Sequence, residues 1–158
     1  MEFNGLDSKT VINCTELKLV GFRVLCAGEQ YIVEIPLAVR KLDERVNEIK
    51  HVADSTVQIG AFVVDTEKEE EDGYWICVEV NEYENIPEGM ETLSIPSQNY
   101  ALWNYKGANL EITGAYEELH HWIAGKNYKR LTGKWHLEIF YSWRDTDNID
   151  VTLLDTVE

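Results

Sequence analysis

The sequence repeats one order of predicted elements in its two halves, and this doubling limits the folds that are open to it. An apolar helix stripe with spacing 4, 3, 4 occurs twice, 77 residues apart, as Ile35, Val39, Leu42, Val46 and as Ile112, Tyr116, Leu119, Ile123. Each stripe follows a strand that ends in glycine, at 22–28 and 102–107, and precedes another strand, at 58–64 and 136–142. Because offsets of 77 to 79 hold for all three elements, the sequence predicts a duplicated unit.

The two units are expected at about 11–82 and 97–157 of a single domain, 1–158, with 83–96 as an extended connector containing Pro87 and Pro96. Each unit reads β-α-β-β. The expected strands are 11–26, 57–65, 74–82, 98–106, 135–144 and 149–156, and the expected helices are 35–49, with Pro36 in its first turn, and 112–124. This order favours an α+β fold, in which a curved, antiparallel-rich sheet has two helices on one face and a ligand cleft on the other.

The charge balance narrows the classes of partner. Fourteen basic and 29 acidic residues give a formal charge of −15, which disfavours direct nucleic acid binding and attracts organic cations or basic proteins. The alternative explanation of this charge is that it only keeps the protein soluble. The sequence shows neither an apolar run of membrane-spanning length nor a signal peptide, so we expect a cytoplasmic protein without a membrane partner.

The motifs of metal sites and common enzymes are missing from the sequence. The three cysteines are far apart and form no C-x-x-C pair, and His120 and His121 are adjacent on a predicted helix, where they point in different directions. His51 and His136 have no partner at metal-ligand spacing. The sequence contains no G-x-S-x-G, P-loop or G-x-G-x-x-G motif. We therefore expect no metal or cofactor, and an enzyme is the less favoured prediction.

Glu138 is the most unusual residue, because it lies in the middle of an apolar strand where the first unit has a small residue. Strand alternation is expected to turn Leu137 and Ile139 toward the helices and His136, Glu138 and Phe140 toward the open face. A carboxylate on an apolar surface is costly unless a cation or hydrogen-bond donor meets it. Flanking aromatic rings also attract positive charge, so this position suits an organic cation.

The same alternation places Trp75 and Glu79 on the predicted open face. Structural roles remain open for each candidate. Glu138 could pair with Arg144, Lys134 or a backbone donor, Glu79 could face solvent, and large aromatic residues such as Trp75 are usually core residues.

Several segments together resemble a known family over about residues 11–156. They are 87–90, 95–103, Gly107, 116–119 with Trp122, and 137–140, and they are similar to the pattern of the GyrI-like small-molecule-binding domain. This domain is also known as the effector-binding domain of AraC-type regulators and occurs in multidrug-sensing transcription factors. The resemblance implies two β-α-β-β units about a pseudo-twofold, with a ligand cleft between them. It also implies that Glu138 faces cationic or aromatic compounds and that Tyr100 matches the family's tyrosine.

Members of that family usually follow a DNA-binding segment, and this sequence resembles the members that stand alone. We therefore predict a binding domain for cationic or amphipathic aromatic compounds, with a role in transcriptional regulation or in the response to drugs and toxins. The predicted ligand-binding residues are Glu138, Trp75, Tyr100, Trp103, Phe140, Glu79 and Phe62. Two alternatives are a protein-interaction module of the gyrase-inhibitor type and a hydrolase of small electrophiles with Glu138 as general base. Monomer and homodimer are both left open.

Overall fold

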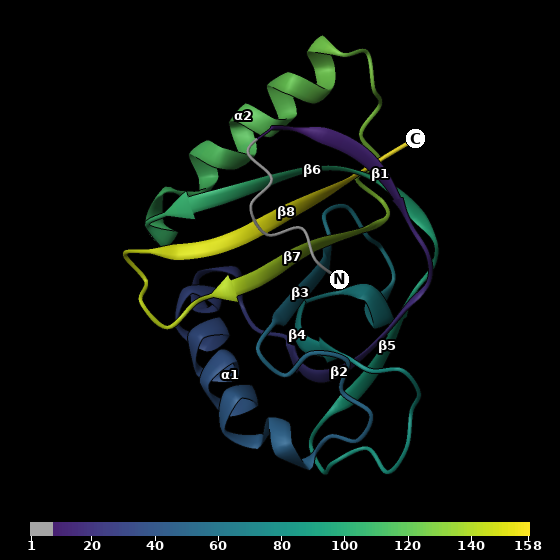
Figure 1. The fold of residues 1–158 in the computed structure, drawn as a ribbon, viewed down its shortest axis with the longest axis vertical. Coiled ribbons are helices and arrows are strands. Elements are labelled where there is room, and N and C mark those ends of the chain that lie inside the picture. The colour runs from purple at the N-terminus through teal and green to yellow at the C-terminus, as the bar shows by residue number, and fades with distance from the viewer. Residues whose placement is uncertain (1–7) are drawn as a thin grey trace.

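Eight antiparallel strands and two α-helices make up the fold that a computed structural model describes for residues 8–158 (Figure 1). The predicted domain starts at residue 1, and residues 1–7 lie outside the described part. The α+β class, the antiparallel sheet and the two helices confirm the predicted class. In chain order the elements are β1 (Thr10–Cys14), β2 (Leu17–Val24), α1 (Tyr31–Arg45), β3 (Gln58–Val63), β4 (Tyr74–Glu79), β5 (Glu91–Ile95), β6 (Gln98–Gly107), α2 (Ile112–Gly125), β7 (Trp135–Ser142) and β8 (Ile149–Val157).

The strand order in the sheet is β1-β6-β8-β7-β3-β4-β2-β5. The segments β2-α1-β3-β4 and β6-α2-β7-β8 both follow the order strand, helix, strand, strand, and they meet in the sheet through β3 and β7. The two halves are therefore arranged symmetrically about the β3–β7 pair. A common ancestral copy for the halves stays a prediction.

One long two-stranded ribbon, in which β1 and β2 pair with β6 and β5, connects the two ends of this sheet. The pairs of β1 with β6 and of β2 with β5 share a single register, from Thr10↔Leu102 and Cys14↔Gln98 to Leu17↔Ile95 and Gly21↔Glu91. The prediction of one strand over 11–26 was wrong, because the ribbon is interrupted at 15–16 and, on the partner side, at 96–97. Pro96 lies in that interruption, so its missing N–H removes no hydrogen bond between the strands. The predicted connector also contains β5, so this extended segment pairs with β2 instead of only crossing.

Helix α1 begins at Tyr31, four residues before the predicted start, and follows a 3-10 turn at Gly28–Gln30. Pro36 therefore lies in the second turn, where it removes a hydrogen bond to the carbonyl of Ile32. Both residues are exposed, so water can satisfy that carbonyl. Helix α2 begins at Ile112, as predicted.

Three strands end two or three residues earlier than predicted, at Val63, Glu79 and Ser142. Beyond two of these ends the backbone leaves the ladder. The N–H of Asp65 donates to the carbonyl of Thr132, and the N–H of Asn81 donates to the carbonyl of His51.

Both helices pack on the same face of the sheet, over its outer strands. Helix α1 lies on β2 and β4, and helix α2 lies on β6, as the separate positions of the helices in Figure 1 show. Leu42 of α1 is buried in a cluster with Phe22 and Ile76, and Leu119 of α2 is buried in a cluster with Val151 and Leu153. The central strands β3 and β7 thus lie between the two helices.

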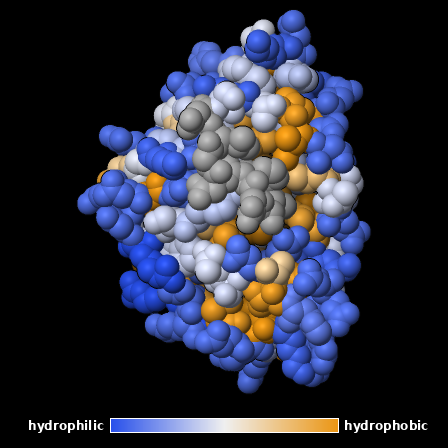
Figure 2. Space-filling model, viewed as in Figure 1, coloured by the Kyte–Doolittle hydropathy of each residue, from blue (hydrophilic) through white to orange (hydrophobic). Residues whose placement is uncertain are grey.

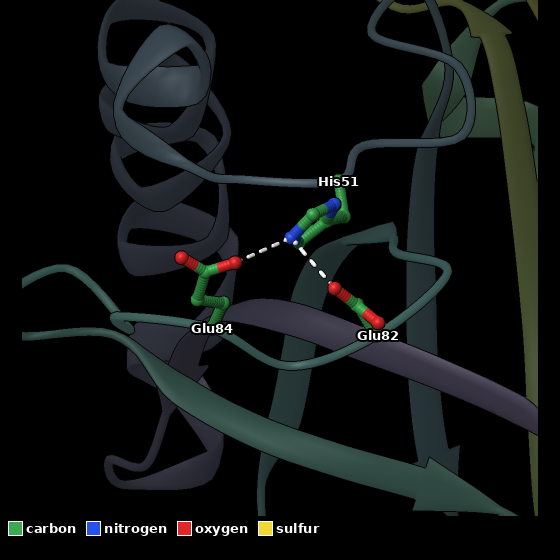
Figure 3. A group of neighbouring side chains, drawn as sticks. All are labelled: His51, Glu82 and Glu84. Carbon is green, nitrogen blue, oxygen red and sulfur yellow. Dashed lines mark hydrogen bonds and ion pairs between the residues drawn. The ribbon is translucent and has the colours of Figure 1, made fainter.

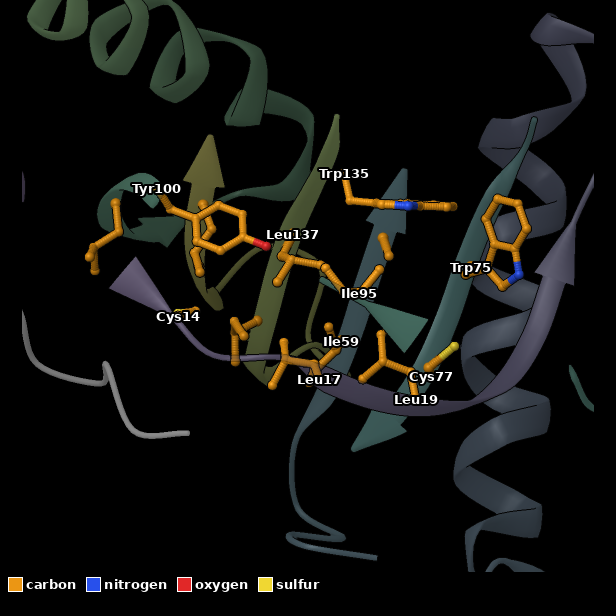
Figure 4. Close-up of a cluster of buried hydrophobic side chains, with 14 of the residues drawn as sticks. Cys14, Leu17, Leu19, Ile59, Trp75, Cys77, Ile95, Tyr100, Trp135 and Leu137 are labelled. Atoms are coloured by element: carbon orange, nitrogen blue, oxygen red, sulfur yellow. The ribbon is translucent and has the colours of Figure 1, made fainter. Parts of the chain in front are cut away.

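The helix-free face is filled by a third apolar cluster (Figure 4). In this cluster Trp75 and Trp135 meet edge to face, with ring centroids 5.1 Å apart. The ribbon places its own residues in the same cluster, so the face is covered core and not a cleft. The cluster includes Leu17, Leu19, Ile59, Cys77, Ile95, Tyr100, Leu137, Ile139 and Leu154.

This packing reverses the predicted faces of β7. Leu137 and Ile139 point away from the helices, and Glu138 and Phe140 point to the helix side. The prediction assumed that helices cover the more apolar side of a sheet. Here the ribbon makes the helix-free side the more deeply buried one, so the apolar row of β7 faces it.

Candidate functional site

The two central strands present three cross-strand pairs on the face between the helices. These pairs are Gln58↔Phe140, Gly60↔Glu138 and Phe62↔His136. Residues directly opposite each other in an antiparallel pair project to the same face. Glu138 is therefore at the centre of the strip of sheet that neither helix covers.

Glu138 is buried, with 8% of its surface exposed, and two phenol groups hold its carboxylate. The hydroxyl of Tyr74 on β4 donates to Oε1 at 2.6 Å, and the hydroxyl of Tyr116 on α2 donates to Oε2 at 2.5 Å. Arg144, one of the predicted ion-pair partners, is bound to Asp43 instead, with Nη2 2.7 Å from Oδ1. No ion pair of Glu138 with a cation is found among residues 8–158.

Burial raises the pKa of Glu138 above its usual value, while the hydrogen bonds from Tyr116 and Tyr74 act in the opposite direction. The same burial, together with the charge of Glu138, raises the pKa of both tyrosines well above the usual value. The phenols therefore stay protonated as donors. A carboxylate held only by neutral donors keeps its charge uncompensated.

The absence of a side chain at Gly60 makes this arrangement possible. A Cβ atom built on Gly60 would lie 1.9 Å from the hydroxyl oxygen of Tyr74 and 3.3 Å from Oε1 of Glu138. The glycine thus leaves the space through which Tyr74 reaches the carboxylate.

A groove of about 380 Å³ lies beside this site, between α1 and the end of β7. Its apolar lining includes Ile35 and Val39 of α1, Phe140 and Trp143, and Ile149 of β8. Phe140 is two residues from Glu138 on the same face of β7, which is about 6.6 Å along a strand. The volume lies within the range of pockets that bind small organic molecules.

Charged residues also line the groove. Arg40 lines the groove, and so do Asp43 and Arg144, which pair with each other. Ile32, which is 73% exposed, precedes the lining residue Ile35 by one helical turn. Over the face shown in Figure 2, the surface as a whole is mainly hydrophilic, with patches of hydrophobic residues.

A second buried polar cluster adjoins the site on its other side. Asp155 of β8 is 1% exposed, and its Oδ1 lies 2.7 Å from Nδ1 of His136 and 3.0 Å from Nε of Arg130. Its Oδ2 contacts Nε2 of His120 on α2. Burial by itself would raise the pKa of Asp155, but hydrogen bonds and charge from His136 and Arg130 outweigh it and lower that pKa. One helical turn separates His120 from Tyr116, so this cluster also anchors the helix whose Tyr116 bonds Glu138.

The structure brings three of the seven predicted site residues onto the strip between the helices. They are Glu138, Phe140 and Phe62, and the ring of Phe62 stacks on His136 and Tyr74 with centroids 5.8 and 6.0 Å away.

The other four predicted residues lie elsewhere. Trp75 and Tyr100 are buried in the helix-free cluster, and the hydroxyl of Tyr100 accepts a hydrogen bond from Nε2 of Gln98 at 2.7 Å. Glu79, at the end of β4, shares the face of Trp75. Trp103 packs with the α2 cluster, and Nζ of Lys9 lies 4.0 Å from its ring centroid.

The sequence reasoning did not identify three residues near Glu138 as site residues, namely Tyr74, Tyr116 and Gln58. Tyr116 had a signal, because a phenol replaces the matching Val39 in the apolar helix stripe. Tyr74 and Gln58 stand at the first positions of their strands, where polar residues are common, so no pattern distinguished them.

A separate group of three possible metal ligands lies on the surface (Figure 3). Nε2 of His51 is 2.7 Å from Oε1 of Glu84 and 2.9 Å from Oε1 of Glu82. Nζ of Lys50 is 3.2 Å from the other oxygen of Glu84. These contacts give both carboxylates partners within the protein, so hydrogen bonding and ion pairing account for the group.

The chain matches the family model of the GyrI-like small molecule binding domain over residues 10–154. Among curated proteins, none matches this sequence. No helix in the described part of the chain is long and apolar enough to cross a membrane.

Solved structures with the same fold are distant in sequence. SAV2435 bound to tetraphenylphosphonium has a TM-score of 0.70 at 14% identity, covering 96% of this chain and 94% of that one. The EcmrR C-terminal domain has a TM-score of 0.67 at 17% identity, and the match covers 97% of this chain and 98% of that one. A hydrolase from Listeria innocua has a TM-score of 0.56 at 12% identity, and the match covers 99% of this chain and 95% of that one. These likenesses establish the fold that the proteins share.

Proposed function

The chain belongs to the family of GyrI-like small molecule binding domains, and from that premise we propose that it captures aromatic organic cations in the groove beside Glu138. The ligand's positive charge is neutralised by the Glu138 carboxylate, and its rings lie against Phe140 and Trp143. A role in transcriptional regulation or in the response to toxic compounds fits the EcmrR relative, whose complex with DNA is known.

The observation that carries this proposal is the state of the Glu138 side chain. It is a buried carboxylate with two neutral donors and no paired cation among residues 8–158, next to a groove with a largely apolar lining. Removing a charge from water without a counter-ion is unfavourable, and a cationic guest relieves that cost. A structural role would be better served by a protein cation or by an apolar side chain.

The geometry leaves room for a further contact on the carboxylate. Each oxygen of Glu138 accepts one phenol hydrogen bond, and an ionised carboxylate has about four acceptor positions. The relative SAV2435 has been solved with tetraphenylphosphonium, a bulky aromatic cation of the class proposed here.

Titration calorimetry with two ions of matched shape tests the proposal. Tetraphenylphosphonium and tetraphenylborate are both tetraphenyl ions of similar shape, but they carry opposite charges. We expect the protein to bind the phosphonium and to reject the borate by at least about tenfold, which is about 1.4 kcal/mol. Equal binding of the two ions, or no binding of either, would refute the proposal.

A hydrolytic activity is the second candidate, because a carboxyl group with a raised pKa beside two phenol donors is also an arrangement for general acid–base chemistry. In that case Glu138 would activate water against a small electrophile bound in the groove. Turnover of such an electrophile that is lost in Glu138→Gln would favour this candidate, and turnover that survives the change would exclude Glu138 as the base.

A further inference from the structure

Gln58 contains a buried hydrogen-bond acceptor that has no partner in the described part of the chain. The side chain lies at the start of β3 and is 3% exposed. Its Nε2 donates to the carbonyl of Val39 on α1 at 3.1 Å, which fixes the orientation of the amide. Its Oε1 has no hydrogen-bond partner among residues 8–158.

Gln58 adjoins the groove through two of the residues that line it. Gln58 is directly opposite Phe140 and donates to the carbonyl of Val39, and both Phe140 and Val39 line the groove. Glu138 projects from the same face, one cross-strand pair further along. Two acceptors, one charged and one neutral, therefore project from the same face of the sheet between the helices.

The large majority of buried side-chain acceptors in native proteins have a hydrogen-bond partner. A ligand that carries a donor can supply the partner that Oε1 lacks, and a site built to bond such a donor rejects ligands without one. A fully alkylated or arylated cation neutralises Glu138 but offers nothing to Oε1 of Gln58. A cation that carries N–H groups satisfies both acceptors.

We propose that Gln58 makes the groove selective for aromatic cations that carry N–H donors, such as protonated amines and amidines, over cations without N–H groups. This inference rests on the proposed function, since it specifies which cations the Glu138 site prefers. Gln58 acts through its amide oxygen, which receives a hydrogen bond from the guest.

Two phenothiazinium dyes provide a matched pair of probes. Thionine and methylene blue carry the same ring and the same single positive charge, but thionine has free amino groups and methylene blue has only dimethylamino groups. For the wild-type protein, titration calorimetry should show thionine binding about tenfold more tightly than methylene blue.

Replacing Gln58 should remove that preference. In Gln58→Leu, and in Gln58→Met as a second variant with an unbranched side chain, the affinity for thionine should fall to that for methylene blue. The affinity for methylene blue itself should change by less than about twofold. Gln30→Leu, at an exposed glutamine outside the groove lining, serves as the control and should keep the preference. Thermal melts of all variants establish that they are folded.

The outcomes separate this inference from the function on which it rests. Equal affinities of the dyes in the wild type, or a thionine preference that survives both Gln58 changes, would overturn the selectivity, as expected if a bound water satisfies Oε1. Binding of tetraphenylphosphonium without binding of thionine would also overturn it and leave the proposed function standing. Binding of no cation at all would overturn both.

Discussion

Gly60 and Glu138 face each other directly across β3 and β7. They occupy matching positions of the two halves, since the repeat offset for these strands is 78 residues, so this pair marks the centre of the symmetry between β3 and β7. At such a symmetric centre two large side chains would compete for the same space. One position is glycine, and the other is a glutamate that the hydroxyl of Tyr74 reaches through the space above the glycine.

Gly60→Ala should therefore disturb the site and weaken the fold. The new methyl group would lie 1.9 Å from the hydroxyl oxygen of Tyr74, so the phenol must move and its hydrogen bond to Glu138 is lost. We expect the free energy of unfolding to fall by about 1 to 3 kcal/mol. Urea denaturation measures this change.

Gly114→Ala is the matched control for that experiment. Gly114 lies in α2, and a Cβ atom built on it meets nothing within 4 Å. Alanine is the better helix former, so this variant should gain up to about 1 kcal/mol of stability. A Gly60→Ala variant that is as stable as the wild type would show that the space above Gly60 does not matter.

Glu138→Gln should make the protein more stable at neutral pH. The raised pKa of Glu138 means that the fold binds its proton more tightly than the unfolded chain does, so ionisation costs stability as pH rises through that pKa. Each unit of pKa elevation corresponds to about 1.4 kcal/mol. The gain over wild type should be largest near pH 8 and should vanish below about pH 4, near the usual pKa of glutamate. A gain that does not change with pH would contradict this explanation.

Tyr116→Phe should raise the pKa of Glu138 further. The hydroxyl of Tyr116 is one of two donors that lower that pKa, and phenylalanine removes it without changing the shape of the ring. Carbon-13 NMR of the Glu138 carboxyl group across a pH titration measures the shift directly. An unchanged titration midpoint would mean that Tyr116 does not bond the carboxylate in solution.

Asp155→Asn should be strongly destabilising, because it leaves Arg130 without its buried counter-ion and removes the carboxylate that contacts His136. The expected loss is about 3 to 5 kcal/mol at neutral pH. The lowered pKa of Asp155 means that its stabilisation is present above the usual aspartate pKa of about 3.9 and is lost as pH falls through the folded value.

Asp43→Asn is the comparison for Asp155, since it breaks the more exposed pair with Arg144 and should cost about 0 to 1 kcal/mol. Equal losses of stability in the two variants, measured by urea denaturation at pH 7, would contradict the distinction between the buried and the exposed ion pair.

The class of the fold could be predicted from the sequence because its signals are local. The 4, 3, 4 stripe of α2 and the alternation of β7 each depend on a few neighbouring residues, and the structure has both elements where they were expected. The same alternation correctly grouped His136, Glu138 and Phe140 on one face.

Which face that was could not be predicted, since it depends on long-range pairing. The ribbon that pairs Leu17 with Ile95 covers the helix-free side, and no local pattern shows that two segments so far apart in the sequence will pair. For the same reason the prediction that Trp75 and Glu138 share a face was wrong. The two residues lie on opposite faces of the sheet. The partners of Glu138 come from β4 and α2, so they too depend on the tertiary fold.

The most direct test of the central claim is the affinity of tetraphenylphosphonium for Glu138→Gln, measured by titration calorimetry. Glu117→Gln, at an exposed position on α2, removes the same charge from the surface and serves as the control. If Glu138 is the counter-ion, its change weakens binding by at least about tenfold, or about 1.4 kcal/mol, and the control leaves the affinity within about twofold. Equal affinities in the wild type and Glu138→Gln would contradict the claim that this buried carboxylate binds the cation.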